Sequence, residues 1–344
     1  MSQPTTTPDR VRDLAWTKRL LERLAEPGFR ERLLEDPERA GAQLGMPWSP
    51  RWIRPLWDAG AEKPDPEPDP RVAAWRDLLE SRLGLRDRLR AEGTIEDPAM
   101  RAWRERQVHR CAGELGLERS ESIVHAPFCV ELSRGCSVGC WFCGLSAGRL
   151  EDHLPYTPEN AEAWRGMLAV LREEIGPGAK WGFCYWATDP LDNPDYERFL
   201  EDFQARMGVI PQTTTALALR DPGRTRRILL QARAGTPVVS RFSVLSPGLL
   251  KKIHETFTPE ELLEVELVVQ GEGSRLGKAF AGRARTGPRE RAVREGLPVD
   301  REEHAGTIAC VSGFLIQPLQ GRVQLISPCR SGERWPEGYV VFGD

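Results

Sequence analysis

The sequence has 344 residues, a net charge of −3 and 29% charged residues, so no bulk positive charge points to a nucleic-acid partner. No apolar run approaches the roughly 18 residues of a membrane span. The polar start, Met1–Asp9, lacks the apolar core of a signal peptide. We expect a soluble, cytoplasmic protein without a nucleic-acid or membrane partner, long enough for one large barrel and a smaller element.

The first hundred or so residues are rich in Arg, Glu and Leu and predict helices. Apolar residues recur near helical spacing at Leu14, Leu20, Leu21, Leu24, Phe29, Leu33 and Leu34. Gly45 can end the helix that follows Asp36-Pro37. Residues 64–70 are a stiff acidic Pro-rich linker, and further helices are expected at about 72–91 and 98–115. The predicted division is an N-terminal helical region at 1–60, linker and helices at 61–120, and a barrel with C-terminal strands at 121–344.

From residue 122 onward the pattern alternates between strands and helices. Strands are expected at 128–133, 181–187, 209–218, 237–245 and 262–269. Helices are expected from Thr157 onward and at 195–207, 222–234 and 247–256. Residues 308–316 and 322–326 look like a hairpin around Gln320-Gly321. The alternation predicts a parallel α/β sheet.

Three cysteines, Cys136, Cys140 and Cys143, follow the first predicted strand at C-x3-C-x2-C spacing. Protein-held [4Fe–4S] clusters usually take four Cys. No fourth cysteine follows at a matching spacing, so a cluster on this loop would keep one iron open for another ligand. The spacing indicates a reactive cluster rather than an electron store.

Other uses of these cysteines have less support. A structural zinc site wants four Cys or His ligands, and the nearest extra candidates are Cys129 and His125. A disulfide framework is disfavoured because the chain is long and has few cysteines. Buried inert thiols also remain open, since free Cys is often a core residue.

The loop resembles that of the radical S-adenosylmethionine (SAM) enzymes, in which an aromatic residue precedes the last cysteine, as Phe142 does here. The resemblance implies a partial (β/α)6 TIM-like barrel of radical SAM type, an α/β fold, preceded here by the N-terminal helical region. It also implies that the open iron binds SAM and that reduction releases a 5′-deoxyadenosyl radical. The implied cofactors are a [4Fe–4S] cluster and SAM, and the implied redox partner is an external electron donor of flavodoxin or ferredoxin type.

Further SAM contacts are expected at the ends of the second and fourth predicted strands, where barrel enzymes place their functional residues. Radical SAM enzymes usually have a Gly-Gly-Glu-type turn after the second strand. This chain departs from it with Ala187-Thr188-Asp189-Pro190, so Asp189 or the Thr188 backbone is the expected acceptor for the SAM amino group. An Asp-capped turn is the alternative. The fourth strand carries polar Ser240, Arg241 and Ser243, which suit ribose hydroxyls and a carboxylate, or a structural ion pair.

The remaining cysteines are isolated in sequence. Cys111 and Cys184 fit core positions, and Cys129 is ambiguous. Cys310 and Cys329 are too isolated for an obvious second cluster. A thiol near a substrate radical can donate a hydrogen atom through its weak S–H bond, and a structural role is the alternative for each.

Four sequence runs resemble the radical SAM epimerases of polytheonamide type, which mature ribosomally made peptides. They are Gly135–Gly144, Ala187–Tyr196, Lys278–Arg285, and Ile326–Cys329 together with Trp335–Tyr339. The resemblance implies that the substrate is a precursor peptide, that a Cα hydrogen is removed, and that a Cys thiol returns one to give a D-residue. Cys310 and Cys329 are the candidate donors.

Two other functions stay open at this point: a radical SAM enzyme that crosslinks peptides, and a non-enzymatic iron–sulfur or zinc protein. The run from Leu21 to Met46 is similar to the helical leader regions of precursor peptides in such pathways. An ordinary helical hairpin is the alternative.

Overall fold

The computed structural model describes residues 8–58, 60, 69–235, 239–270, 279–286 and 306–343. The chain divides into two compact units, one of residues 1–84 and 243–276 and the other of residues 85–242 and 277–344. The sequence places boundaries near residues 60 and 120, whereas the first unit ends at residue 84 and takes in a later segment. Most of the expected linker at 64–70 lies outside the described residues.

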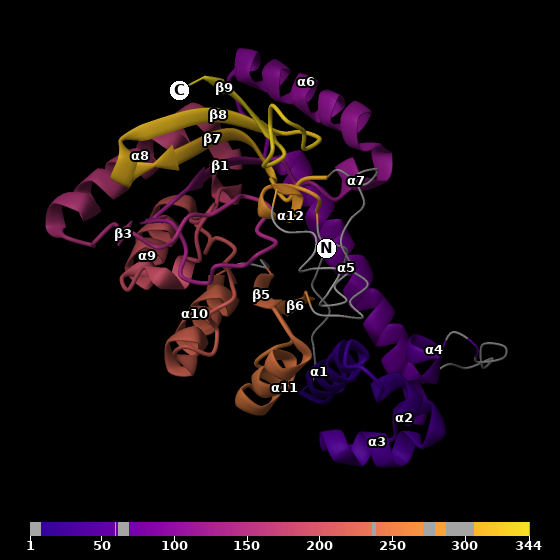
Figure 1. Cartoon of the computed structure of the whole chain (residues 1–344). Helices are drawn as coiled ribbons and strands as arrows, with labels where there is room; N and C mark the ends of the chain where they lie inside the picture. The colour runs from indigo at the N-terminus through magenta and orange to yellow at the C-terminus, as the bar shows by residue number, and fades with distance from the viewer. Residues whose placement is uncertain are drawn as a thin grey trace. The chain divides into compact units, whose positions relative to one another are not determined.

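The first unit is mainly helical (Figure 1). Its elements are α1 (Pro8–Arg23), α2 (Phe29–Glu35), α3 (Pro37–Leu44), η1 (Pro50–Ile53), α4 (Arg54–Trp57), the first part of α5 (Pro70–Glu92), α11 (Pro247–Thr256) and β6 (Val265–Val269). Leu20, Phe29 and Leu33 are buried in one core, as their helical spacing predicts. Gly45 ends α3 with φ of 74°, a conformation that favours glycine.

The second unit contains a four-stranded sheet in the order β1-β7-β8-β9. Its strands are β1 (Ala126–Val130), β7 (Val311–Gln317), β8 (Arg322–Pro328) and β9 (Tyr339–Gly343). β1 and β7 are parallel, with Phe128 opposite Phe314. β7, η5 (Pro318–Gln320) and β8 form the expected antiparallel hairpin. The strand β9 was not predicted.

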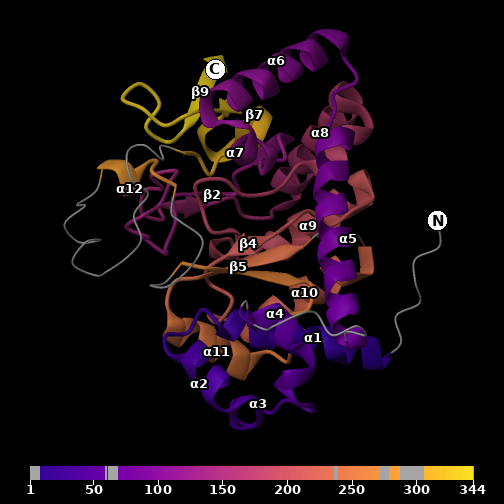
Figure 2. The ribbon, with the colours of Figure 1, turned by 90° about the vertical axis from the view of Figure 1, so that its right-hand side faces the viewer.

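Helices cover this sheet. α6 (Pro98–Leu115) and the short α7 (Leu117–Glu121) precede β1, and α6 packs on β7 and β8 (Figures 1 and 2). α8 (Pro158–Ile175) and α9 (Tyr196–Met207) pack on each other and share a core with β1. Phe128 and Val130 enter that core, whereas Cys129 points to a second cluster with Phe183 and Leu315. Cys129 therefore lies on the face away from α8 and α9, and the register shift between Ala126 and Phe128 places Ala126 in the same cluster.

The remaining parallel pairs of the second unit are short. β4 (Thr214–Thr215) pairs in parallel with β5 (Ser240–Val244), with Thr214 opposite Arg241. α10 (Pro222–Gly235) lies between these two strands along the chain. The described strands form separate sheets and do not close into a barrel.

The strand predicted at 181–187 is wrong. η2 (Gly176–Trp181) extends to its first residue, and only Phe183 forms a bridge, parallel to Cys129. A Cβ on Gly182 would lie 2.3 Å from the Phe128 ring, so the two segments approach too closely there for side chains between them. The strand predicted at 209–218 is reduced to the two residues of β4. Parallel pairing is observed between β1 and β7 and between β4 and β5. No described helix is long and apolar enough to cross a bilayer.

Candidate metal centre

The three-cysteine loop follows β1 and is closed at its base by a small antiparallel pair. β2 (Ser133–Arg134) pairs with β3 (Asp152–His153). At Gly135, φ is 81° and a Cβ would lie 1.9 Å from the Arg149 carbonyl oxygen, so this position requires glycine. The Cys136 N–H donates to the Gly148 carbonyl at 3.0 Å. The loop therefore starts and ends at one point, with all three cysteines between.

The three thiols lie within electrostatic range of one another. Burial, with added effects of the Cys143 and Cys136 thiols and against the Arg283 cation, raises the pKa of Cys140 to about 11. Burial also raises the pKa of Cys136, although backbone N–H groups of Val138 and Gly139 donate to its sulfur and oppose the shift. The protein environment alone therefore favours the protonated thiol at Cys136 and Cys140.

Hydrogen bonds to sulfur match what a cluster needs. Besides the donors to Cys136, the Ala147 N–H donates to the Cys143 sulfur at 3.4 Å. Such bonds and the local charge set the reduction potential of iron–sulfur clusters. Among the described residues no group of three or more His, Cys, Asp or Glu is arranged so that it could hold a metal ion.

The loop is also held from outside by a segment near residue 282. The Arg283 N–H donates to the Cys143 carbonyl at 2.9 Å. A Cβ on Gly282, whose φ is 52°, would lie 2.4 Å from the Gly144 carbonyl oxygen. On the loop itself, the expected aromatic Phe142 packs edge-on against Trp141, with ring centroids 5.4 Å apart.

The turn after Phe183 is the place where the family resemblance expects a SAM contact. The Asp189 carboxylate, 5% exposed, accepts from Leu191 N at 3.0 Å, Thr215 Oγ1 at 2.7 Å and Ala216 N at 2.7 Å. It thereby caps η3 (Pro190–Asp192) and ties the turn to β4. Burial raises its pKa to about 6 against these bonds. The Thr188 hydroxyl reaches only its neighbour's carbonyl, at 3.5 Å.

Asp192, in the same turn, holds the cysteine loop directly. Its carboxylate accepts from Ser137 N at 2.8 Å and Ser137 Oγ at 2.6 Å, immediately after Cys136. Arg220 donates to the same carboxylate at 2.9 Å and to Ser137 Oγ at 2.6 Å. The Asp192 side chain is 0% exposed, whereas Ser137 is exposed and the Arg220 side chain is 50% exposed, so these bonds join a buried carboxylate to groups at the surface.

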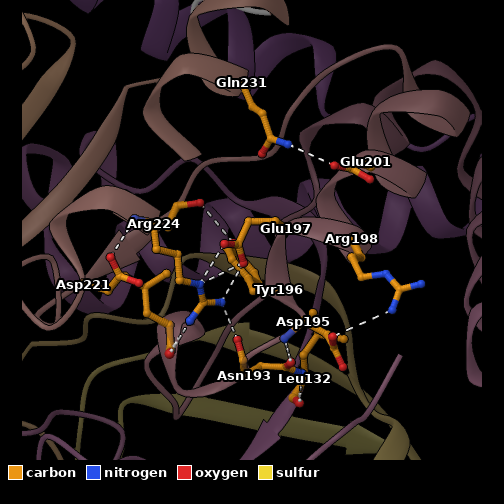
Figure 3. Close-up of polar contacts among 12 residues, drawn as sticks. Leu132, Asn193, Asp195, Tyr196, Glu197, Arg198, Glu201, Asp221, Arg224 and Gln231 are labelled. Carbon is orange, nitrogen blue, oxygen red and sulfur yellow. Dashed lines mark hydrogen bonds and ion pairs between the residues drawn. The ribbon is translucent and has the colours of Figure 1, made fainter. Parts of the chain in front are cut away.

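Asn193 fastens the base of the loop (Figure 3). Its amide nitrogen donates to the Leu132 carbonyl at 3.0 Å and to the Leu154 carbonyl at 2.9 Å, one on each side of the β2–β3 pair. Arg224 in turn donates to the Asn193 carbonyl at 2.6 Å and holds Glu197 by bonds of 2.7–3.0 Å. The turn thus fixes the loop at two places.

The polar residues of β5 have different surroundings. Ser240 is buried, whereas Arg241 is exposed and its N–H donates to the Thr213 carbonyl at 2.8 Å. Ser243 is half-buried and falls in the first unit. The Arg241 cation lowers the pKa values of Tyr185 and Cys310, which burial raises more strongly. Arg241, Tyr185 and Cys310 therefore lie near one another.

The two candidate hydrogen donors occupy different places in the second unit. Cys310 is half-buried beside Tyr185 and Cys129, and burial raises its pKa to about 11. Cys329 is 2% exposed beside α6, and burial raises its pKa to about 12. Both thiols are therefore held as S–H, the form that hydrogen-atom donation needs.

Segments that carry these thiols reach the cysteine loop. A Cβ on Gly144 would lie 3.0 Å from the Ile308 side chain, two residues before Cys310. The Gly282 N–H donates to the Pro336 carbonyl at 2.6 Å, in the stretch between Cys329 and β9. Gly144 and Ile308, which are 164 residues apart in sequence (308 − 144), thus meet at this loop, and the stretch after Cys329 contacts the Gly282 segment that holds the loop.

Sequence reasoning missed Ser137, Asp192, Arg220 and Glu131. Asp192 stands in the turn already singled out, and a second acidic residue three positions after Asp189 was the available signal. Glu131 is 4% exposed, with its pKa raised by burial, and accepts from Gln317 Nε2 at 2.7 Å. It lies near Cys129, because its charge is one of the causes, after burial, that raise the pKa of that thiol.

Comparison with known proteins identifies a relative without a known role. No family model matches the chain, and no solved structure matches it. The chain is 43% identical over 347 aligned positions to the "Uncharacterized protein y4wI" of Sinorhizobium fredii (strain NBRC 101917 / NGR234). The alignment spans 98% of this chain and 67% of that protein. The chain therefore belongs to the same protein family as y4wI.

Proposed function

We propose that the protein is a radical SAM enzyme that acts on a ribosomally made precursor peptide. The observation that carries the proposal is the gathering of the Cys136, Cys140 and Cys143 thiols on one loop that is fastened at both ends. The eight cysteines are all free, which suits a reducing compartment, and we place the protein in the cytoplasm.

When bound, a [4Fe–4S] cluster and SAM supply reductive cleavage of SAM to a 5′-deoxyadenosyl radical, with electrons from a flavodoxin- or ferredoxin-type donor. Cys136, Cys140 and Cys143 would hold the cluster. Thr188 with its carbonyl, Asp189, and Ser240 and Arg241 of β5 are the proposed SAM contacts within the second unit, whereas Ser243, the remaining expected contact, falls in the first unit. Phe142 shields the loop. Most of the Asp189 acceptor capacity is already used by backbone N–H groups and Thr215, so the Thr188 carbonyl is the freer acceptor.

We propose epimerisation as the reaction. A hydrogen atom leaves Cα of an L-residue, and the S–H of Cys310 or Cys329 returns one to the opposite face. The thiol sulfur is then one electron and one proton short, and the external donor and solvent restore them. The enzyme gains rate by holding Cα between the two transfer sites. The raised pKa values of both thiols support this role, because they keep the hydrogen on sulfur.

The test has two stages. Anaerobically reconstituted protein is incubated with SAM, dithionite and candidate precursor peptides, and 5′-deoxyadenosine is measured. Its absence with every peptide would count heavily against a radical SAM enzyme. In deuterated water, each epimerisation installs one deuterium and gives a D-residue on chiral analysis. A product lighter by two hydrogens identifies a crosslinking enzyme instead. Variants Cys310→Ala and Cys329→Ala identify the donor.

A further inference from the structure

The segment after β8 is joined to α6 at two points that flank Cys329. Arg110 Nη2 donates to the Pro328 carbonyl at 2.8 Å. The Arg330 N–H donates to the Glu114 carboxylate at 3.1 Å. The residues before and after Cys329 are therefore both bonded to one stretch of α6, across a separation of 216 or more residues in sequence.

Cys111 lies on that same stretch of α6. It follows Arg110 and precedes Glu114 by three residues, so it belongs to the face that the segment after β8 contacts. Its side chain is 0% exposed. Cys329 is 2% exposed, and its N–H donates to the Gly338 carbonyl at 2.8 Å, which fixes its backbone. Two buried thiols are thus confined between the same pair of hydrogen bonds.

The Cys111 thiol is close enough to Cys329 to affect its ionisation. The Cys111 thiol raises the pKa of Cys329, adding to the larger effect of burial, and Glu114 acts in the same direction whereas Arg110 opposes it. Cys111 itself has a pKa raised to about 11, mainly by burial. If the two cysteines were only unrelated core residues, hydrogen bonds on both sides of Cys329 to the stretch of α6 around Cys111 would not be required.

We propose that Cys111 and Cys329 form a buried dithiol that two-electron oxidation closes into a disulfide. In the reaction, two S–H bonds break and one S–S bond forms, and an oxidant of the diazene class takes up two electrons and two protons to become a hydrazine. The product links α6 covalently to the β8–β9 connection. A Cys329 held in a disulfide has no hydrogen atom to give.

The dithiol stands apart from the proposed radical chemistry, since its formation needs neither cluster nor SAM. If Cys329 is the hydrogen donor, closure of the pair would remove that donor without touching the cysteine loop. Because burial keeps both thiols protonated at neutral pH, we expect closure to be slow there and to speed up with pH, since the thiolate is the attacking form.

The experiment treats the full-length protein with diamide at pH 7, 8 and 9, followed by acid quench, alkylation in denaturant and digestion without reductant. We expect a linked peptide pair containing Cys111 and Cys329, lighter by about 2 Da than the two free peptides. Its initial rate should rise about tenfold per pH unit, since both pKa values lie above this range. Cys111→Ser and Cys329→Ser should each abolish the link. Cys184→Ser removes another fully buried thiol and should leave it intact.

Recovery of Cys111 and Cys329 as separately alkylated peptides from oxidised wild-type protein would overturn the proposal. Linkage of Cys329 to a different cysteine would overturn it equally. Wild-type protein gives the decisive result, so a variant that folds poorly does not weaken the test. Failure of SAM cleavage would leave the linked peptide unaffected, which separates this inference from the proposed function.

Discussion

Replacing Asp192 by Asn tests how the cysteine loop is positioned. The Asp192 side chain is 0% exposed, and its carboxylate accepts two hydrogen bonds from Ser137. Bonds to a charged group contribute about 1.5–3 kcal/mol each. The pair with Arg220, a side chain 50% exposed, adds about 0–1 kcal/mol. Asn keeps one acceptor and turns the other into a donor, so we expect a loss of about 3 kcal/mol in the free energy of unfolding.

Denaturant unfolding measures that loss, and iron bound per chain after reconstitution measures the effect on the loop. Asp202→Asn is the matched control, since Asp202 accepts from the Tyr156 hydroxyl at 2.6 Å and from Arg165 at 3.3 Å without touching the loop. Both variants should lose stability, but only Asp192→Asn should lose iron at temperatures where both are folded. Equal iron retention in the two variants would refute a positioning role for Asp192.

Two further perturbations have calculable outcomes. Gly282→Ala should lose more stability and more iron binding than Gly208→Ala. Both positions have positive φ, but only at Gly282 would the new Cβ lie against backbone, 2.6 Å from the Cys143 carbonyl oxygen. Equal losses in thermal unfolding and iron content would show that the backbone strain of positive φ alone causes the effect. Buried His125 has its pKa lowered to about 3, first by desolvation and then by Arg104, so the unfolded chain takes up a proton below about pH 6.5 that the folded chain refuses. The free energy of unfolding should therefore fall from pH 6.5 toward pH 4, by up to about 1.4 kcal/mol per pH unit. The fall should be less steep in His125→Asn, which can keep the bond to Ser312. Parallel pH profiles for the two proteins would exclude His125 as the titrating group.

Helix boundaries were predictable because their signals are local. The expected helices at 98–115 and 247–256 coincide with α6 and α11, and each begins with a capping side chain followed by proline, Asp97-Pro98 and Ser246-Pro247. The extent of the strands was not predictable from local signals. Residues 181–187 have strand-like composition, but Gly182 packs on the Phe128 ring, and only Phe183 pairs with β1.

The shared loop of the three cysteines was predictable from their spacing. Three cysteines within eight residues identify a shared loop without a structure. The support of that loop was not predictable, because Asp192 and Ser137 are 55 residues apart and meet only through the fold. Cys111 fitted a core position in sequence, and its proximity to Cys329 depends on contacts between α6 and the segment after β8.

Anaerobic reconstitution followed by EPR spectroscopy tests most directly whether Cys136, Cys140 and Cys143 hold a cluster with an open iron. We expect about four irons per chain, a signal on dithionite reduction, and a changed signal when SAM is added. Cys140→Ala should lose the signal. A stoichiometric zinc content, or a reduced cluster whose EPR signal is the same with and without SAM, would contradict the proposed radical SAM site.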